Sequence, residues 1–398
     1  MNTGLPSSPQ TRPPVSCAAA CPFFGVCGGC DFQDSLYTDQ LTWKEQRLRE
    51  LLTPLKVPAE KWLPMRHSDQ EYPVYFRNKI RYGLCLDEQG NYAISRHAPE
   101  NASSEVAVTT CLLQSERSVL VGSITAKLAQ KYEWSLYDPK AQEGWFRHLL
   151  IREGKYTGEL LVGLVTSMEG PAEEVVEWGR AIAEIEGCVG VVWVQDIEGK
   201  LEDILLSGRS YLYEQLGDLR FRISLHAFFQ TNSEMAAKLY QAAADAVQGS
   251  KVVWDLYAGS ATIGCAVAKN AEKVLSIESN PSALEDAEEN KLLNHATNLE
   301  FRSGTVEDML KPADLATAPD AIIVDPPRAG LTQQARTLIT YARPKKLVYI
   351  SCNPNTFLRD ALALQLGGFK IKEIGGFDLF PHSHHQEVFS IWEPRTRA

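Results

Sequence analysis

The chain has 398 residues and a net charge of −10, and 44% of its residues are hydrophobic, as in ordinary globular proteins of two or three domains. The negative net charge excludes a uniformly basic coat for nucleic acid, although a local positive groove depends only on where the charges lie. No run of about 18 apolar residues occurs, so we expect no transmembrane helix.

The first 16 residues are rich in proline and polar side chains and contain no apolar signal core. We expect residues 1–16 to be a flexible leader and the protein to be cytoplasmic. Nine cysteines are too few for a secreted disulfide scaffold of this length, and several of them cluster near the N-terminus. This distribution indicates metal ligation in a reducing compartment.

The N-terminal cysteines have the spacing of a metal centre. Cys21, Cys27 and Cys30 form a C-x5-C-x2-C pattern, and two glycines before Cys30 let the backbone approach a compact group closely. An iron–sulfur cubane needs a fourth thiolate. Three other cysteines could supply it: Cys17, Cys85 and Cys111. Zinc is the alternative, but the unequal C-x5-C arm favours an iron–sulfur cluster. The pattern does not match the C-x3-C-x2-C loop of a radical-SAM enzyme.

The next two segments carry basic side chains. Residues 36–52 have helical periodicity, and we interpret their basic residues, among them Lys44, as a solvated amphipathic face. Residues 72–82 alternate basic and aromatic side chains in a strand-like pattern, which suits contact with RNA phosphates and bases. An edge strand with protective charges explains residues 72–82 equally well.

Short β patterns separated by turns follow as far as about residue 224. Helices are predicted for residues 115–131 and 171–185. Strands are predicted for residues 106–110, 148–151, 160–165, 189–194 and 220–223. We therefore expect a metal-cluster region with its helix over residues 17–54, a mixed α+β central domain over 55–225, and a C-terminal α/β domain over 226–398.

The C-terminal domain opens with a pattern typical of nucleoside binding. Residues 252–264 predict a strand, a glycine turn and a helix start, and residues 273–278 predict a second strand that ends in Glu278. Glu278 would accept hydrogen bonds from ribose hydroxyls. Because no G-x-G-x-x-G is present, S-adenosylmethionine (SAM), which lacks phosphates, fits better than a dinucleotide.

Two later strands deliver reactive side chains to the carboxyl edge of the sheet. The strand at residues 321–324 runs into Asp325-Pro-Pro-Arg328, where two prolines restrict the loop. The strand at residues 347–350 ends at Ser-Cys352-Asn-Pro, and a helix capped by Asn355 or Thr356 is predicted to follow. Ligands of open α/β folds bind at this edge.

The sheet closes with strands at residues 369–377 and 388–392. Between them lies Phe-Pro-His382-Ser-His-His-Gln-Glu387. Three histidines suggest a metal site, but the thiolates near the N-terminus are the stronger candidates for ligation.

Four motifs occur together in this chain: Phe-Phe-Gln230-Thr-Asn, Asp325-Pro-Pro-Arg-Ala-Gly, Ser-Cys352-Asn-Pro-Asn-Thr and Phe-Pro-His-Ser-His-His-Gln-Glu387. With the C-x5-C-x2-C spacing they resemble the SAM-dependent RNA 5-methyluridine methyltransferases over residues 21–392. The resemblance is greatest to the branch that carries a [4Fe–4S] cluster and methylates uridines of 23S ribosomal RNA.

The resemblance implies an α/β fold with a Rossmann-like SAM methyltransferase domain at the C-terminus, a central α+β domain that binds RNA, and a small N-terminal iron–sulfur region. Cys352 is similar in position to the family's nucleophile, and Glu387 to its general base. The SAM contacts implied are Gln230, Tyr257, Thr262, Glu278 and Asp325. The cluster ligands implied are Cys21, Cys27, Cys30 and Cys111.

Two departures from the family pattern matter. Ala261 stands where the first cofactor loop often has a second glycine, so the turn is expected to differ. Many relatives carry an N-terminal oligonucleotide-binding barrel, whereas this chain begins almost directly at the cysteines. We therefore expect RNA to bind the central domain and the cluster region of a monomer.

Two alternatives remain from the sequence. The same chemistry on a T-loop uridine of tRNA is one, because motifs do not separate RNA substrates. A non-catalytic iron–sulfur protein that binds RNA is the other, and the intact Cys352 and Glu387 disfavour it.

Overall fold

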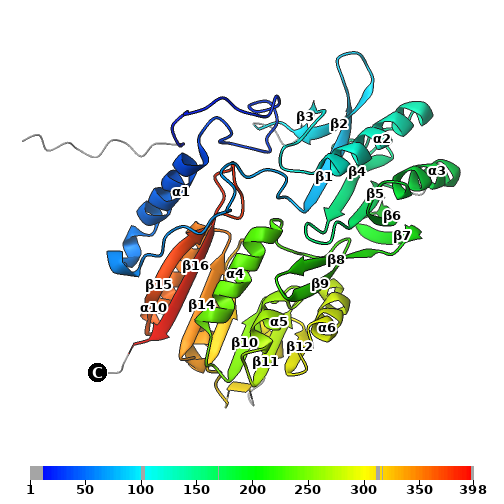
Figure 1. The fold of residues 1–398 in the computed structure, drawn as a ribbon. Coiled ribbons are helices and arrows are strands. Elements are labelled where there is room, and N and C mark those ends of the chain that lie inside the picture. The colour runs from blue at the N-terminus through cyan, green and yellow to red at the C-terminus, as the bar shows by residue number, and fades with distance from the viewer. Residues whose placement is uncertain (1–11, 100–103, 169, 311–313, 316, 396–398) are drawn as a thin grey trace, which may run out of the picture.

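The computed structural model describes residues 12–99, 104–168, 170–310, 314–315 and 317–395, which form two seven-stranded sheets and a two-stranded hairpin (Figure 1). The central sheet has the strand order β3-β2-β1-β4-β5-β6-β7. Its strands are β1 (Lys79–Leu86), β2 (Tyr92–His97), β3 (Glu105–Ala107), β4 (Phe146–Glu153), β5 (Leu160–Thr166), β6 (Cys188–Ile197) and β7 (Lys200–Gly208). Neighbours are antiparallel except β5 and β6, which run parallel and are connected through α3 (Ala172–Ala183).

Two helices cover one face of the central sheet. α2 (Glu116–Tyr132) begins where the side chain of Ser115 accepts a hydrogen bond from the Ser118 amide. Trp178 of α3 is fully buried, and its indole donates to Thr125 of α2 at 2.9 Å. The opposite face shares a core with the hairpin formed by β8 (Tyr211–Leu216) and β9 (Leu219–Ser224).

The C-terminal sheet has the order β12-β11-β10-β13-β14-β16-β15. Its strands are β10 (Val252–Leu256), β11 (Lys273–Glu278), β12 (Leu299–Ser303), β13 (Ala321–Val324), β14 (Lys346–Ser351), β15 (Phe369–Phe377) and β16 (Glu387–Pro394). The first five run parallel, and β16 is antiparallel to both β14 and β15. The strand order reverses at β10, as in Rossmann-like sheets, so the predicted α/β class is confirmed.

Helices cover both faces of the C-terminal sheet, which is why its strands are apolar on both sides. On β10, for example, Val253 belongs to one core and Trp254 to the other. One face carries α4 (Ser233–Ala246), α5 (Thr262–Ala268) and α6 (Leu284–Leu293). The other carries α1 (Tyr37–Leu51), α7 (Val306–Met309), α9 (Gln333–Ala342) and α10 (Pro354–Leu366). Short 3-10 turns occur at η1 (Thr53–Leu55), η2 (Ala59–Lys61) and η3 (Pro281–Ala283).

Helix α1 packs on the C-terminal sheet although it lies near the N-terminus of the chain. It contacts α10 and β15, and Leu48 is buried in the same core as the strands (Figure 1). The preceding loop, residues 12–36, extends from α1 toward β1–β3 of the central sheet. The N-terminal segment therefore touches both halves of the molecule.

Three expectations from the sequence are wrong. Lys44 is not solvated: its side chain is completely buried against Asp378. Residues 72–82 are not one exposed strand, because Tyr75 has φ 55°, and β1 begins at Lys79 between β2 and β4 rather than at an edge. The cap of α10 is Asn353, with Pro354 as the first helical residue, in place of Asn355 or Thr356.

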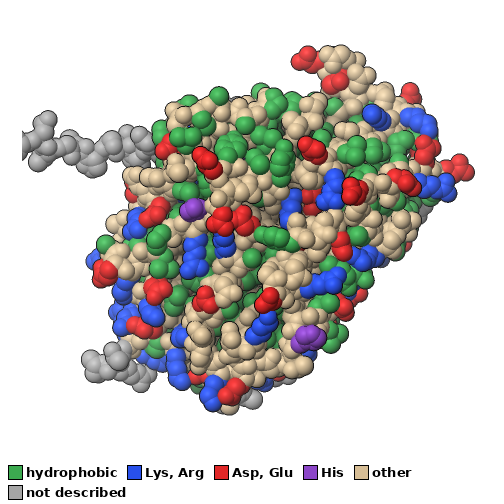
Figure 2. Space-filling model, viewed as in Figure 1, with side chains coloured by type: hydrophobic (Ala, Val, Ile, Leu, Met, Phe, Trp, Pro, Cys, Tyr) green, Lys and Arg blue, Asp and Glu red, His purple; other side chains and the backbone are tan. Residues whose placement is uncertain are grey.

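The predicted leader falls mostly on residues 1–11, which lie outside the described residues. Residues 12–16 lie against the turn before α1, where Arg12 pairs with Asp34 and the Ser16 hydroxyl donates to Asp39 at 2.6 Å. Among the described helices, none combines the length and the apolar character needed to span a bilayer. Acidic and basic side chains are interspersed over much of the face shown in Figure 2.

Candidate active site

The predicted catalytic pair meets at the carboxyl edge of the C-terminal sheet. Cys352 directly follows β14, and Glu387 is the first residue of β16. These two strands are antiparallel, and their register pairs Ser351 with Val388. The next residues outward are therefore Cys352 and Glu387, which the fold places side by side.

Cys352 lies half-buried between this strand end and α10. Burial and then the carboxyl groups of Glu387 and Asp325 raise the pKa of its thiol to about 11, against the opposing effect of the Arg328 guanidinium. Asn353 braces the turn, because its side-chain amide donates to the Arg328 carbonyl at 3.0 Å and its side-chain oxygen accepts from the Asn355 amide at 3.1 Å. The thiol therefore has a defined position but needs a base or a cation to ionise.

Glu387 is a buried carboxyl group with unused hydrogen-bonding capacity. Its side chain is 2% exposed, and its Oε2 atom has no hydrogen-bond partner among the described residues. Burial raises the pKa of Glu387 well above its usual range, Asp325 raises it further, and Arg328 opposes both effects. A carboxyl group with a raised pKa holds a proton better than an exposed one, as a general base requires.

Asp325 and Gln230 form a second polar pair at the same edge. The Gln230 side-chain amide donates to Asp325 at 3.3 Å. Burial raises the pKa of Asp325 to about 7, which this hydrogen bond partly opposes. The Gln230 carbonyl accepts from the Asn78 side chain at 2.9 Å, so the segment before β1 braces the motif that carries Gln230.

The loop after β10 forms a cradle of the kind that SAM needs. Gly259 has φ 53°, and a Cβ atom there would meet only the ring of Phe228 at 4.0 Å among the described residues, so space remains beside the loop. The Glu278 carboxylate accepts from the Gly259 amide at 3.0 Å and from the Asn280 amide at 2.7 Å. Glu278 thereby anchors the loop and keeps lone pairs for ribose hydroxyls.

The two other predicted SAM residues flank this loop. Tyr257 follows β10 with φ 65°, and its hydroxyl is buried without a partner among the described residues. Thr262 begins α5, and its side chain is hydrogen-bonded to that of Tyr240. Ala261, the residue before α5, has φ 58°, a left-handed conformation that glycine adopts more easily. The residues present therefore fit SAM. Alanine in place of glycine at position 261 strains the backbone of the turn.

A cavity of about 610 Å³ opens in front of Cys352. Its walls come from four separate segments of the chain: α1, the loop after β13, the residues at the start of α10, and the loop before β16. The lining residues include Trp43, Arg47, Arg328, Cys352, His385 and Gln386. This volume lies in the range of small-ligand pockets and can admit a nucleobase together with part of its sugar.

The three histidines before Glu387 have separate partners. His382 is buried, and its Nε2 atom lies 2.8 Å from the Pro73 carbonyl. The Nδ1 atom of His384 lies 2.6 Å from the Asp31 carboxylate, and that of His385 lies 3.5 Å from the Arg328 guanidinium. The described residues contain no group of three or more His, Cys, Asp or Glu side chains that could hold a metal ion as they stand.

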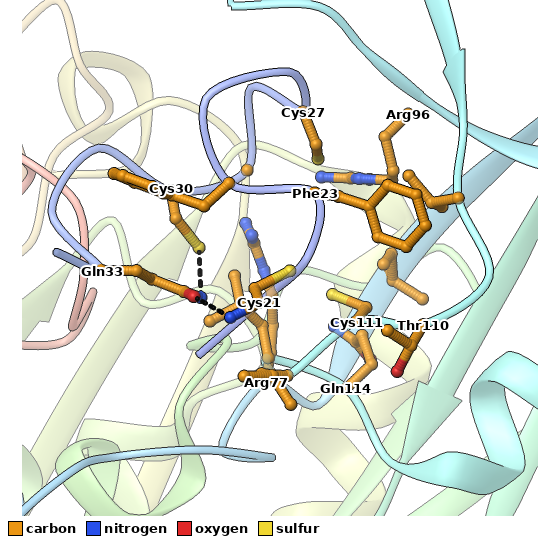
Figure 3. A pocket seen from close by; sticks show the side chains of 16 residues that line it. Cys21, Phe23, Cys27, Cys30, Gln33, Arg77, Arg96, Thr110, Cys111 and Gln114 are labelled. Atoms are coloured by element: carbon orange, nitrogen blue, oxygen red, sulfur yellow. Dashed lines mark hydrogen bonds between the residues drawn. The ribbon is translucent and has the colours of Figure 1, made fainter. Parts of the chain in front are cut away.

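Four cysteines nevertheless line one small hollow between the N-terminal loop and the central sheet (Figure 3). They are Cys21, Cys27, Cys30 and Cys111. Burial and, to a smaller extent, the three other thiols raise the pKa of Cys30 to about 12, against a decrease from the Gln33 hydrogen bond. The Gln33 side-chain amide donates to the Cys30 sulfur at 3.3 Å.

The other two candidates for a fourth ligand lie elsewhere. Neither Cys17 nor Cys85 lines the hollow. Cys17 hydrogen-bonds to the Gln33 carbonyl at 3.6 Å, and Cys85 lies on β1, where burial and then Glu105 and Asp87 raise its pKa. Cys111 is thus the cysteine that the fold brings to Cys21, Cys27 and Cys30.

Sequence reasoning missed several residues that shape the site. Arg328 influences both Cys352 and Glu387, although its sequence signal was only its place after two prolines. Asp255 is buried inside β10, and burial raises its pKa to about 7; a carboxylate within an apolar strand is a signal that could have been noticed. Lys44 carried no comparable signal, because its partner Asp378 is remote in sequence.

Comparisons with known proteins agree with this geometry. A family model described as tRNA (uracil-5-)-methyltransferase matches residues 202–393. A protein of Caldanaerobacter subterraneus named as an RNA methyltransferase is 33% identical over 393 residues, which cover 96% of this chain and 86% of the relative. An RNA methyltransferase of Bacteroides thetaiotaomicron is 32% identical over 409 residues, covering 96% and 89%.

A solved structure extends the likeness to the fold of nearly the whole chain. The tRNA (uracil-54, C5)-methyltransferase of Pyrococcus abyssi, in complex with S-adenosyl-L-homocysteine, superimposes with a TM-score of 0.74 and 27% identity. The match covers 92% of this chain and 86% of that one. The chain therefore belongs to the family of SAM-dependent RNA 5-methyluridine methyltransferases.

Proposed function

We propose that this enzyme methylates C5 of a uridine in 23S ribosomal RNA, with Cys352 as nucleophile and Glu387 as general base. The observation that carries the catalytic assignment is the placement of Glu387 beside Cys352, which lines the 610 Å³ cavity. The ribosomal substrate rests on the four cysteines, which resemble those of the iron–sulfur branch of the family. We also propose that the enzyme acts as a monomer in the cytoplasm.

The reaction begins with the thiolate of Cys352. Carbon C5 of uracil is a weak nucleophile, and addition of the Cys352 sulfur to C6 converts the ring to an enolate with electron density at C5. SAM, when bound, supplies a methyl group that is activated by its sulfonium. After C5 has taken the methyl group, Glu387 removes the C5 proton. The electron pair of that C–H bond forms the C5–C6 double bond, and the C6–S bond breaks to release the thiolate.

The charges of the site support these two roles. Because burial and the nearby carboxyl groups raise the pKa of Cys352 to about 11, only a small fraction of this thiol is ionised at neutral pH unless a base or a cation assists. Arg328 lowers the pKa of both Cys352 and Glu387, so its positive charge favours the reactive anion in each case. The Arg328 guanidinium could also donate hydrogen bonds to the enolate oxygen or to a nearby phosphate.

The central domain supplies cations for RNA. In the register of β1 and β4, Lys79 pairs with Arg152, and Arg81 is exposed two residues further along the same face. Burial and then the charges of Arg152 and Arg81 lower the pKa of Lys79 to about 7. Arg152 is buried and donates to the carbonyls of Leu225 and Ala227, which leaves Lys79 and Arg81 as the cations that can reach a phosphate. We propose that Lys79 and Arg81 contact the RNA backbone.

We further propose that Cys21, Cys27, Cys30 and Cys111 hold a [4Fe–4S] cluster. Zinc would bind thiolates at about 2.3 Å, so that four ligands converge on one point. The four cysteines line one hollow, and the C-x5-C-x2-C spacing favours a polynuclear cluster there. The Gln33 amide hydrogen bond to Cys30 is of the kind that stabilises a thiolate ligand. The reaction needs no redox step, so the cluster would act in structure. Protein purified without oxygen should absorb broadly near about 400 nm; a colourless, zinc-containing sample would overturn this assignment.

The general base is tested by Glu387→Gln, which keeps the shape of the side chain and removes its basicity. We expect the variant to form the C6 adduct and to transfer the methyl group but to release product slowly, so that a covalent protein–RNA species accumulates on denaturing gels. Glu393→Gln, on the same strand but exposed and paired with Lys370, is the matched control. Normal turnover by Glu387→Gln would remove Glu387 from the mechanism.

A uridine of tRNA is the second candidate substrate, because the Pyrococcus abyssi relative is named as a tRNA (uracil-54, C5)-methyltransferase. In either RNA the target base must leave its stack, which costs a few kcal/mol and least in a loop. Mass spectrometry of 5-methyluridine in rRNA and tRNA from a deletion strain separates the two. Loss of the modification from 23S rRNA alone supports the proposal, and loss from tRNA alone replaces it.

A further inference from the structure

Helix α1 presents a buried polar face to the loop that leads to Glu387. Tyr37, Gln40 and Lys44 lie on one side of the helix, and all three are buried. A helix that packs on an apolar core ordinarily turns hydrophobic side chains inward. These three polar residues are directed instead at residues 378–386, which connect β15 to β16.

Lys44 fastens this loop at three points. Its ammonium group donates to the Asp378 carboxylate at 2.6 Å, to the Phe380 carbonyl at 3.0 Å and to the His385 carbonyl at 2.9 Å. The last of these contacts is two residues before Glu387. The Tyr37 hydroxyl donates to the second oxygen of Asp378 at 2.9 Å, so both oxygens of that buried carboxylate are engaged.

Further contacts hold the middle of the loop. The Gln40 side chain accepts from the His382 amide at 2.9 Å, and His382 has φ 65°, a strained conformation that its surroundings must impose. The loop that contains Cys30 contributes as well. The amides of Asp31 and Phe32 donate to the His382 carbonyl at 2.7 and 3.0 Å, and the His384 amide donates to the Asp31 carboxylate at 2.9 Å.

Stability alone does not explain why Lys44 is buried. Burial lowers the pKa of Lys44, and the carboxylate of Asp378 works against that decrease. A fully buried ion pair contributes about as much to stability as apolar residues of the same shape would. What an apolar residue cannot supply is directed hydrogen bonds to one carboxylate and two backbone carbonyls of a single loop.

We propose that Lys44 is a positioning residue for the reaction, which acts by holding the loop that carries Glu387 in reach of the C5 proton. The proposal rests on the role of Glu387 proposed above. Sulfur addition and methyl transfer depend on Cys352, which lies on another segment, so they should depend less on Lys44, although His385 of the same loop lines the cavity. Proton removal from C5, with re-formation of the C5–C6 double bond and loss of the sulfur, should depend on it.

The test uses two versions of the same change. Lys44→Met removes the ammonium group but leaves the buried Asp378 carboxylate without it, which can prevent folding. Lys44→Met combined with Asp378→Asn removes both charges and retains an amide that can bond to Tyr37. Arg49→Met is the matched control, since Arg49 lies on α1 and pairs with Glu45 within the helix, away from the loop.

Two RNA substrates separate the steps. RNA with 5-fluorouridine stops after methyl transfer because fluorine cannot leave C5 as a cation, so the rate of trapping reports adduct formation without the base. We expect the double variant to trap this RNA within a few-fold of the wild-type rate. On ordinary uridine RNA its turnover should fall by about 10- to 100-fold, the loss that misplacement of a catalytic group produces, and a covalent species should accumulate.

Two results would overturn the proposal: normal turnover of uridine RNA by the double variant, or an equal decrease in trapping and turnover, which indicates a merely structural role. Glu387→Gln, assayed in parallel, keeps the two proposals distinct. If Glu387→Gln does not accumulate the adduct, the general base itself is misassigned. If it does and the double variant behaves as wild type, only the role of Lys44 is wrong.

Discussion

The protein holds two partly buried thiol sites, the hollow around Cys30 and the cavity at Cys352, and the groups beside the thiols differ between them. In the hollow, burial raises the pKa of Cys30 to about 12, and the next contributors that raise it are other thiols. In the cavity, burial raises the pKa of Cys352 to about 11, and the next contributors are the carboxyl groups of Glu387 and Asp325. Burial alone therefore does not distinguish a metal ligand from a nucleophile.

What distinguishes the two sites is the charge that each can stabilise. Several thiolates close together repel one another, so the hollow is stable in its ionised form only around a cationic group such as a cluster. A single thiol beside a guanidinium and a carboxyl group can ionise for a moment, add to an electrophilic carbon and be released again. Each of the following experiments changes a cysteine of one of the two sites or a residue near it.

The largest effect is expected from Cys352→Ala. Removal of the nucleophile should lower methyl transfer to RNA by more than about 10⁴-fold, because no other group can create the enolate. SAM affinity should stay within a few-fold, since Glu278 and Asp325 are unchanged. Radiolabelled methyl transfer and equilibrium dialysis measure the two quantities. Retained activity would show that the cavity thiol is not the nucleophile.

The hollow is tested by comparing Cys111→Ala with Cys85→Ala. Cys111 lines the hollow and Cys85, on β1, does not. After anaerobic purification we expect Cys111→Ala to lose most of its iron and visible absorbance, whereas Cys85→Ala should retain both. The measurement is iron and sulfide content per chain. Equal iron content in the two variants would remove Cys111 from the ligand set.

A smaller effect concerns pH and Arg328. Since the pKa of Cys352 lies near 11, the rate of trapping 5-fluorouridine RNA should rise with pH by about tenfold per unit through the neutral range, as the thiolate fraction grows. Arg328→Gln removes a charge that lowers this pKa, so trapping at a given pH should slow, by roughly tenfold if the pKa rises by one unit. A flat pH profile in the wild type would indicate that another group has already ionised the thiol.

The smallest effect is expected at Ala261, next to the cradle for SAM. Its left-handed backbone, φ 58°, costs alanine roughly 1 kcal/mol relative to a conformation it prefers. Ala261→Gly should therefore raise the unfolding free energy by up to about 1 kcal/mol, less the extra entropy that glycine brings to the unfolded chain. Thermal denaturation measures this. A loss of stability would mean that the buried methyl group contributes more packing than the strain costs.

Local patterns predicted the parts of the site that depend on strand ends. Cys352, Asp325 and Glu278 each follow or end a short apolar β-branched run, and parallel strands bring such ends to one edge. Glu387 was reached through its motif, and the register of β14 with β16 explains why it lies beside Cys352. In these cases the residues that precede the side chain in the sequence form a strand, and the sheet to which that strand belongs fixes where the side chain lies.

The predictions that proved wrong concern residues whose surroundings come from segments far away in the sequence. The burial of Lys44 depends on Asp378, which is 334 residues away, so a window of helix periodicity could not reveal it. Tyr82 lies on a strand that alternates like an edge strand, yet it is fully buried, because β1 lies inside the sheet and α2 and α3 cover this face. Long-range pairing overrides local pattern in both cases.

The distance in sequence between Lys44 and Asp378 has a consequence for biosynthesis. At 5–20 residues per second the ribosome needs roughly 15 to 70 s to make the 334 residues that separate them. During that interval α1 has its lysine but not the carboxylate and carbonyls that later surround it. The contact between Lys44 and Asp378 therefore forms only in the last moments of synthesis. On the roles proposed above, a chain that ends before Asp378 would lack both Glu387 and the loop that Lys44 holds.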